Sequence, residues 1–136
     1  YFRHWLEMQS RIPNPPKMFM VNWFRKSADG KFLWPGYGEN MRALKWILDR
    51  SHARVGAKET PVGFIPRMED LNLSGLDVKE DVVREAMRVD LGEWEQEIES
   101  QKEWFDKIGP TLPRQLTLQR ELLLEAVKTA RASEPK

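Results

Sequence analysis

The 136-residue chain contains no cysteine, only two histidines and no long apolar run. Without cysteine it can form neither a disulfide nor a thiolate metal site. His4 and His52 lie far apart without a nearby second ligand, so the sequence does not predict a zinc site. No stretch approaches the ~18 consecutive apolar residues of a membrane-spanning helix. The opening letters YFRHWL lack the pattern of a signal peptide, and we expect a cytoplasmic protein.

Motifs for covalent or phosphate chemistry are also missing. The chain has no G-x-S-x-G nucleophile motif. Gly30-Lys31 does not form a Walker loop, because Phe32 follows it in place of Ser or Thr. The acidic residues from Glu93 to Glu103 recur at helical spacing with Lys102 among them, which is typical of a solvated helix face. The residues alone therefore predict no catalytic site in this chain.

Charge is distributed unevenly along the sequence. Residues 1–60 carry 11 Lys and Arg against 5 Asp and Glu, whereas residues 61–136 carry 11 against 16. An anionic ligand would therefore meet the first half of the chain. Attraction between a basic and an acidic half of one fold explains the same pattern, and charge alone favours that explanation.

Short strands are predicted in the first half of the chain. Residues 18–24 are a brief apolar run with β-branched and aromatic members, typical of a buried strand. An Asp-Gly pair within residues 27–30 supplies a turn. Residues 31–34 are then predicted as a return strand, ended by a Pro-Gly pair. Residues 60–66, bracketed by prolines, are predicted as one more short strand.

The remaining apolar periodicities predict helices and an α+β, mainly helical fold class. We expect helices from Phe2 to the proline run at 12–16, at 41–50, at 82–87, from 90 to 108, and from 113 to the polar tail. The second carries an apolar stripe of Met41, Leu44, Ile47 and Leu48. Asn40 or a neighbour is expected to cap it, and Asp90 with Glu93 to cap the fourth.

Residues 22–40 concentrate aromatic rings among glycine, proline and charge. The rings are Trp23, Phe24, Phe32, Trp34 and Tyr37. Stacking a base on such a ring is worth ~1–3 kcal/mol, but stacking alone does not select one base. Selection needs polar atoms aimed at the base edge, and an asparagine side chain or amides in a glycine-rich bend can supply them.

Other interpretations of this segment stay open at this point. Aromatic rings at alternate positions of a hairpin are usually core, and composition and spacing favour core packing by roughly two to one. A third hypothesis is a non-catalytic module whose aromatic hairpin binds a proline-rich peptide or single-stranded RNA. Arg25, Lys26 and Lys31 would surround a ligand with positive charge suited to phosphates.

The letters of this segment carry a specific resemblance. VNWFRK, GKFLWPGYGEN and the following R-x-L-x-W resemble, almost letter for letter, the guanine-binding segment of the GTP-dependent phosphoenolpyruvate carboxykinase family. The flanks HWL, PPKMF, TPVGFIP and LNLSGL agree as well. The match is strong over about residues 1–76, a guanine-nucleotide-binding segment, whereas the helical segment 77–136 is similar only in layout. The resemblance implies one compact unit cut from the larger α/β C-terminal lobe of a longer enzyme.

The resemblance also implies an activity for the parent enzyme. Members of the family are lyases of gluconeogenesis that convert oxaloacetate and GTP into phosphoenolpyruvate, CO₂ and GDP with Mn²⁺ or Mg²⁺. The family's phosphate loop, metal ligands and oxaloacetate-binding arginines all lie upstream of the part matched here. We therefore expect the chain alone to be inactive and to bind guanine nucleotide weakly at most. We expect the missing N-terminal part as partner, no membrane or nucleic acid, and a risk of self-association.

Carried onto this sequence, the family motif implies a nucleotide site. Its residues are Trp23, Phe24, Phe32, Gly36, Tyr37, Gly38, Glu39 and Asn40. Phe24 and Tyr37 would sandwich the guanine, and Phe32 would close one side. Asn40 with nearby amides would read the base edge, while Trp23 and the backbone of 36–39 line the pocket. Most family members carry Phe where this chain has Tyr37, which adds a hydroxyl that needs a partner.

Overall fold

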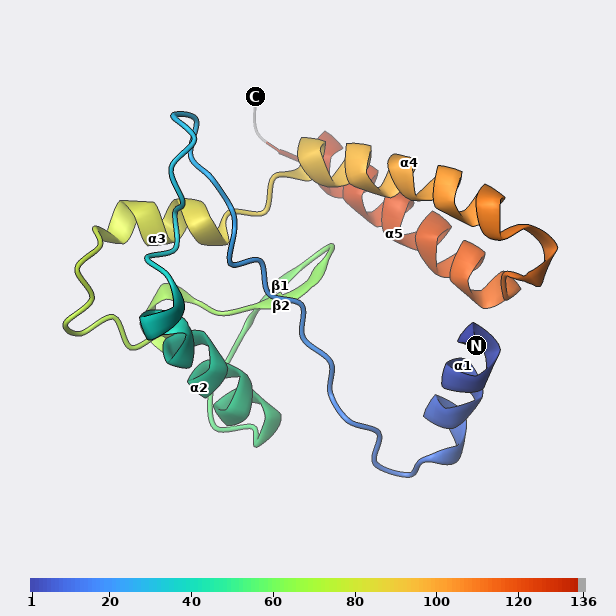
Figure 1. The fold of residues 1–136 in the computed structure, drawn as a ribbon, viewed down its shortest axis with the longest axis horizontal. Helices are drawn as coiled ribbons and strands as arrows, with labels where there is room; N and C mark the ends of the chain where they lie inside the picture. The colour runs from blue at the N-terminus through green and yellow to red at the C-terminus, as the bar shows by residue number, and fades with distance from the viewer. Residues whose placement is uncertain (135–136) are drawn as a thin grey trace. The chain divides into compact units, whose positions relative to one another are not determined.

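The computed structural model of the chain describes residues 1–134 and is mainly helical (Figure 1). The elements in chain order are α1 (Phe2–Arg11), η1 (Tyr37–Glu39), α2 (Asn40–Ser51), β1 (Lys58–Thr60), β2 (Gly63–Ile65), η2 (Met68–Asp70), α3 (Glu80–Met87), α4 (Leu91–Ile108), η3 (Gly109–Thr111) and α5 (Arg114–Ala132), where η is a 3₁₀ turn. One two-stranded sheet accompanies the helices. The predicted mainly helical α+β class is therefore confirmed.

The chain forms two compact units. One comprises Tyr1–Pro16 and Val89–Lys136, and the other comprises Lys17–Arg88. All of the predicted nucleotide-site residues belong to the second unit. The division of the sequence into 1–76 and 77–136 stays a prediction about the parent enzyme.

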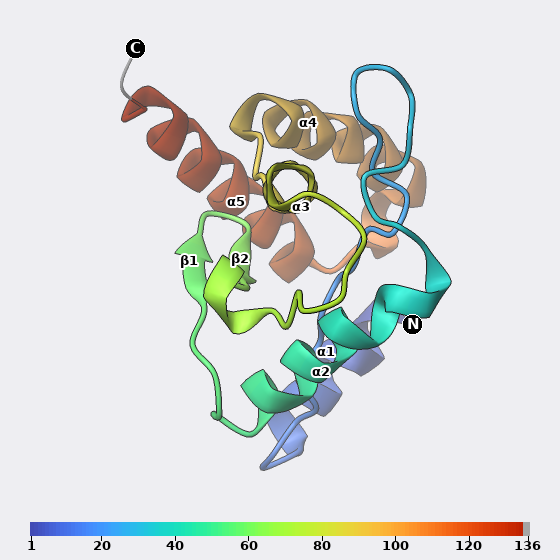
Figure 2. The same cartoon turned by 90° about the vertical axis from the view of Figure 1, so that its left-hand side faces the viewer.

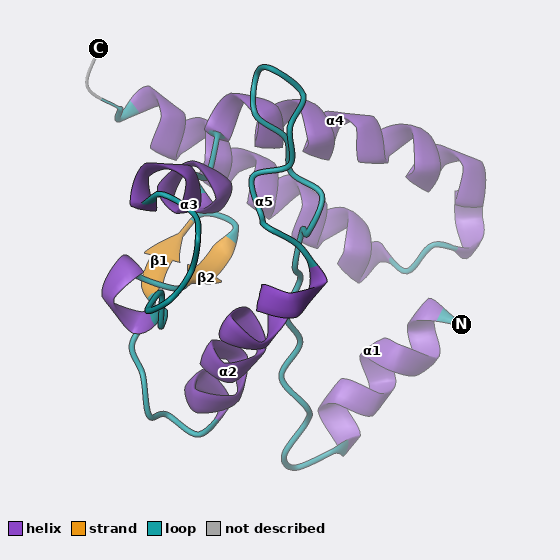
Figure 3. Cartoon of the chain, turned by 60° about the vertical axis from the view of Figure 1, so that its left-hand side comes forward, coloured by secondary structure: helices purple, strands orange, loops and turns teal. Residues whose placement is uncertain are grey.

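The first unit is built on α4 and α5, which run side by side in opposite directions (Figures 1 and 3). Their shared face buries Leu91, Ile98, Leu124 and Val127. The predicted cap of α4 is confirmed, because Asp90 Oδ1 accepts the backbone N–H of residue 93 at 2.9 Å. The predicted end of this helix at residues 108–110 is confirmed too. Gly109, with a positive φ of 67°, ends the helix, and η3 leads into α5.

Helix α1 also belongs to this unit. It ends at Arg11, directly before the proline run, as the sequence predicts. It has no fully buried side chain, and Trp5 remains 58% exposed. Its apolar face is therefore largely uncovered.

The second unit packs around Trp46 of α2, Leu71 directly after η2 and Val83 of α3. The partly buried apolar residues against this core are Phe19, Ile47, Val55, Ala57, Met68, Leu73, Leu76, Val78 and Met87. Figure 2 gives a second view of the helices and the hairpin of this unit. The predicted amphipathic helix at 82–87 is confirmed as α3, with Val83 only 1% exposed.

The predicted buried strand at 18–24 is wrong. Residues 18–22 have no regular secondary structure, and Met18 and Met20 are 91% and 88% exposed. Within residues 18–22 only Phe19 turns inward, and its ring meets Trp46 edge to face with centroids 6.0 Å apart. An apolar run becomes a strand only when a partner supplies hydrogen bonds, and within residues 1–134 this run has none.

The other two strand predictions are partly wrong. Residues 31–34 provide a single antiparallel bridge, Lys26 to Phe32, in place of a strand. Residues 60–66 are interrupted by a turn, so that β1 and β2 pair with Lys58 opposite Ile65. Gly63, with φ 118°, permits this reversal, and an uninterrupted strand would not form across it.

The predicted helix at 41–50 is confirmed as α2. Its apolar stripe is only partly covered, since Met41, Leu44 and Leu48 are 66%, 44% and 54% exposed, whereas Ile47 packs against the core that contains Trp46. The predicted cap by Asn40 or a neighbour is wrong, because the Asn40 side-chain oxygen accepts from Trp34 and the N-cap residue Glu39 makes no side-chain cap hydrogen bond. The preceding η1 turn satisfies the backbone N–H groups of Glu39 and Asn40, which donate to the carbonyls of Gly36 and Tyr37.

Candidate functional site

A narrow loop brings the rings of Phe24 and Phe32 together. It is the blue loop at the top of Figure 1. Backbone bonds from Leu33 to Arg25 and from residue 27 to residue 31, both 2.9 Å, close it. Phe24 and Phe32 consequently meet edge to face, with ring centroids 6.2 Å apart. They are 73% and 57% exposed, and Tyr37 is 92% exposed. This exposure contradicts the alternative that the three rings are ordinary core.

A bend after Pro35 positions the remaining predicted site residues, from Gly36 to Asn40. Gly36 has φ 116° and ψ −169°, a conformation that side-chain-bearing residues avoid. The single turn η1 follows, with the Glu39 amide bonded to the Gly36 carbonyl at 3.1 Å and the Asn40 amide bonded to the Tyr37 carbonyl. These two amides are committed to the turn. Among residues 36–40, the backbone N–H groups that could donate to a base edge are therefore those of residues 36–38.

Glu39 anchors this bend. Its carboxylate pairs with Arg42 Nε at 2.5 Å, and both side chains are mostly buried. The same guanidinium donates to the carbonyls of Asn72 and Ser74 at 2.5 and 3.0 Å. Arg42 thus ties η1 to the loop that carries the buried Leu71. No local sequence pattern predicts this contact, because the two segments lie 30 residues apart.

Trp34 was also left out of the predicted site. Its indole Nε1 donates to Asn40 Oδ1 at 2.8 Å, and its ring lies 6.0 Å from that of Trp23. Trp34, Asn40 and Trp23 are all half-buried. The bend between the two partners creates this bond, and no spacing rule in the sequence signals it.

Not every predicted pairing is seen. Phe24 lies with Phe32, Trp23 with Trp34, and Trp34 with Asn40. Among the described residues no ring contact involves Tyr37. The proposed sandwich between Phe24 and Tyr37 therefore stays a prediction.

The three cations near the rings already have partners within the chain. Arg25 donates to the carbonyls of Ala86 and Arg88 at the end of α3. Lys26 lies over the Phe32 ring, 5.1 Å from its centroid. Lys31 pairs with Asp29 at 2.8 Å.

Asp29 belongs to the turn between the two phenylalanines. Its hydrogen bond from Lys31, followed by that from Ser27, lowers the pKa of its carboxyl. The carboxylate therefore stays charged, and keeps these two hydrogen-bond partners, to a lower pH than an aspartate without them. This cluster shapes the loop that presents the rings.

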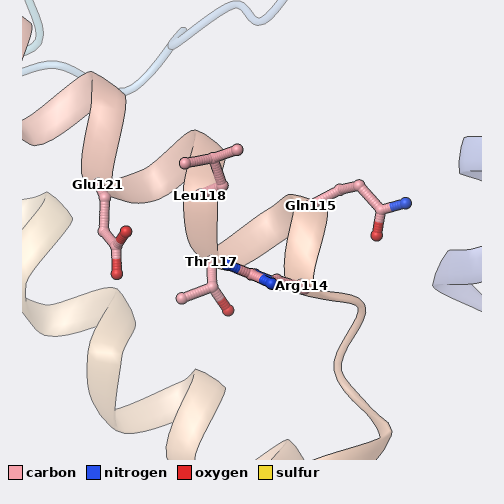
Figure 4. Close-up of a pocket in the computed structure, with 5 residues that line it drawn as sticks. All are labelled: Arg114, Gln115, Thr117, Leu118 and Glu121. Atoms are coloured by element: carbon pink, nitrogen blue, oxygen red, sulfur yellow. The ribbon is translucent and has the colours of Figure 1, made fainter.

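A hollow elsewhere on the chain contains none of these residues. Figure 4 shows it, formed entirely by residues from the start of α5: Arg114, Gln115, Thr117, Leu118 and Glu121. Across residues 1–134, His, Asp and Glu side chains do not gather into a group of three that could hold a metal ion. Within the same part of the chain, no helix is long and apolar enough to cross a membrane.

Comparison with known families assigns the chain. The family model described as "Phosphoenolpyruvate carboxykinase C-terminal P-loop domain" matches residues 1–126. The chain belongs to this family. Membership in the phosphoenolpyruvate carboxykinase family confirms the resemblance carried by the aromatic segment.

Curated carboxykinases from bacteria and archaea are similar along almost the whole chain. A phosphoenolpyruvate carboxykinase [GTP] of Anaeromyxobacter dehalogenans (strain 2CP-1) is 67% identical over 131 residues, which is 96% of this chain and 22% of that protein. Proteins of the same name from Corynebacterium efficiens and Thermoplasma volcanium are 42% and 45% identical over 98% and 90% of this chain, and 22% and 20% of their own length. The chain spans about a fifth of the length of these relatives.

Proposed function

We propose that this chain is the guanine-recognising part of a GTP-dependent phosphoenolpyruvate carboxykinase. The reaction would convert oxaloacetate and GTP into phosphoenolpyruvate, CO₂ and GDP in the cytoplasm. The observation that supports the proposal most is the exposed Phe24–Phe32 pair, which precedes the η1 bend in the sequence of a chain of this family.

The exposed rings would hold the base by stacking. Phe24 presents most of its ring to solvent, so a planar base can cover it without displacing core residues. Tyr37 would cover the opposite face and Phe32 one side. Each base–aromatic contact of this kind is worth ~1–3 kcal/mol. Binding would bury surface that is costly to leave in water.

The η1 bend would read the base edge. Asn40 and the amides of residues 36–38 supply polar atoms within one turn of the exposed Tyr37 ring. Gly36 and Gly38 leave open space around the backbone, since no atom lies within 4 Å of where a Cβ would stand. A ligand can therefore approach this backbone closely.

The rest of the chemistry would lie outside this chain. Phosphoryl transfer needs metal ions and positioned cations around the phosphates, and residues 1–134 hold no cluster that could bind a metal. Mn²⁺ or Mg²⁺ would therefore be held by the remainder of the enzyme. This chain would contribute base specificity and position the nucleotide.

The remainder of the enzyme is also the proposed physical partner. Met18, Met20 and the α2 residues Met41 and Leu48 are exposed apolar side chains on one unit. Such surface usually belongs against another protein surface. Without that partner we expect the isolated chain to self-associate.

A binding experiment on the complete natural protein tests the proposal. We expect GDP to bind more tightly than ADP, and Phe24→Ala to weaken GDP binding roughly 5- to 150-fold by removing a stacking contact. Asn40→Ala should reduce the preference for guanine. Isothermal titration with GDP, ADP and a short single-stranded RNA measures these effects.

Phe64→Ala is the matched control. Phe64 lies in the same unit and is 56% exposed, close to the exposure of Phe32, but belongs to the β1–β2 hairpin. Its removal should leave GDP affinity unchanged. Tighter binding of RNA than of GDP, without discrimination between bases, would contradict the proposal.

A further inference from the structure

We propose that Trp34 is a positioning residue that sets base specificity by fixing the orientation of the Asn40 amide. This inference rests on the proposed function, because it concerns how the same bend distinguishes guanine from other purines. Trp34 would act through its contact with Asn40, the residue proposed to bind the base edge, and would not contact the base itself.

The chemistry of the contact fixes which amide atom faces Trp34. An indole N–H donates hydrogen bonds and cannot accept them. The side-chain atom that receives it, 2.8 Å away, must therefore be Oδ1 of Asn40 and not Nδ2. The usual uncertainty between the oxygen and nitrogen of an amide does not arise here.

The indole is itself held in place. Its ring lies against Trp23 with centroids 6.0 Å apart. Leu33, the preceding residue, is buried at 6% exposure, and Pro35 follows. Asn40 is fixed at the start of α2 because its backbone N–H donates a hydrogen bond to the Tyr37 carbonyl. Both partners are thus anchored through their neighbours, so the bond restricts the amide plane.

The orientation decides what a base would meet. With Oδ1 turned to Trp34, the NH₂ group of Asn40 remains as the pair of donors on the other side of the amide. Guanine carries acceptors at O6 and N7, whereas adenine carries an amino donor at position 6. Donors therefore suit guanine, and an amino group at the same place would face another donor.

Loss of the indole N–H should remove this restriction. The amide could then turn over and offer its oxygen to an amino group at position 6. Guanine would lose part of its advantage, and a 6-amino purine would gain a partner. A change in the ratio of affinities is the signature, because a purely structural defect would weaken both nucleotides alike.

The test uses Trp34→Phe in the complete natural protein. Phenylalanine keeps an aromatic ring against Trp23 but has no N–H. The two ligands are GDP and 2,6-diaminopurine riboside 5′-diphosphate, which has an amino group in place of O6 and keeps the 2-amino group. We expect the GDP preference of the unchanged protein to fall ~10-fold in the variant, measured by titration calorimetry.

Trp46→Phe controls for the exchange of tryptophan for phenylalanine. Trp46 lies in the same unit, and its Nε1 has no hydrogen-bond partner within the described residues. This variant should keep the full preference for GDP. Thermal unfolding of both variants checks that they are folded.

A second variant covers the case in which Trp34→Phe does not fold. Asn40→Asp can still accept from Trp34 but has no NH₂ group, so it should lose the preference for GDP. Retention of that preference in either folded variant would overturn the role of Trp34. If the unchanged protein itself fails to prefer GDP over both ADP and the diaminopurine nucleotide, the proposed function fails instead.

Discussion

The aromatic side chains of residues 22–40 differ in solvent exposure, which the number of rings in the sequence does not reveal. Trp34 and Trp23 are half-buried, whereas Phe24, Phe32 and Tyr37 face solvent. Aromatic residues in a sequence are equally suited to a core or to a ligand site. Solvent exposure distinguishes core rings from ligand-binding rings here. It favours a ligand site for Phe24, Phe32 and Tyr37.

This exposure leads to a stability prediction. Phe24→Ala and Phe32→Ala should each lower the free energy of unfolding of the chain by about 1 kcal/mol or less, because little buried area is lost. Leu71→Ala, at a core residue only 8% exposed, should cost about 2–5 kcal/mol. Urea unfolding followed by circular dichroism compares the three. A loss above about 3 kcal/mol for either phenylalanine would show that the rings are core.

Among the elements, helices were easier to predict than strands. The ends of α1 and α4 follow from a proline run and from a cap with a terminal glycine, all local features. A strand depends on a partner that the local sequence does not contain. Residues 18–24 therefore look like a strand yet have no regular structure along most of their length, and 60–66 folds back on the residues before it.

The η1 bend provides an element-level prediction with a matched pair of glycines. An added Cβ would meet open space at both Gly36 and Gly38, but only Gly36 has a positive φ, of 116°. Gly36→Ala should therefore destabilise the chain by about 1–3 kcal/mol through backbone strain. Gly38→Ala should change stability by less than about 1 kcal/mol.

Thermal or urea unfolding of the two alanine variants measures this difference. Because the bend carries Tyr37 and Asn40, Gly36→Ala should also weaken GDP binding in the complete natural protein. Equal stability of the two variants would mean that the Gly36 conformation is not required.

The molecule as a whole consists of two units, each with a small core of its own. Exposed apolar side chains on α1 and α2 remain beside these cores. The chain corresponds to about a fifth of its relatives, so surfaces of this kind suit contacts with the rest of such an enzyme.

The isolated 136-residue chain should not form phosphoenolpyruvate. With oxaloacetate, GTP and Mn²⁺ it should show no turnover above the protein-free reaction, because the chain spans only about a fifth of the length of its relatives and the proposal places the phosphate and metal sites in the remainder. A coupled assay for phosphoenolpyruvate measures this, with the complete natural protein as the positive control. Turnover by the isolated chain would contradict the proposed division of roles.

The sequence by itself determined the family, the helices and the candidate ring residues, because these depend on local spacing and on a long uninterrupted motif. Only the tertiary structure decided which rings are exposed, that Arg42 ties the bend to residues 72–74, and that Trp34 holds Asn40. These features arise where the backbone folds back on itself. Burial and hydrogen bonding between separated residues are set by that folding, and no local pattern encodes them.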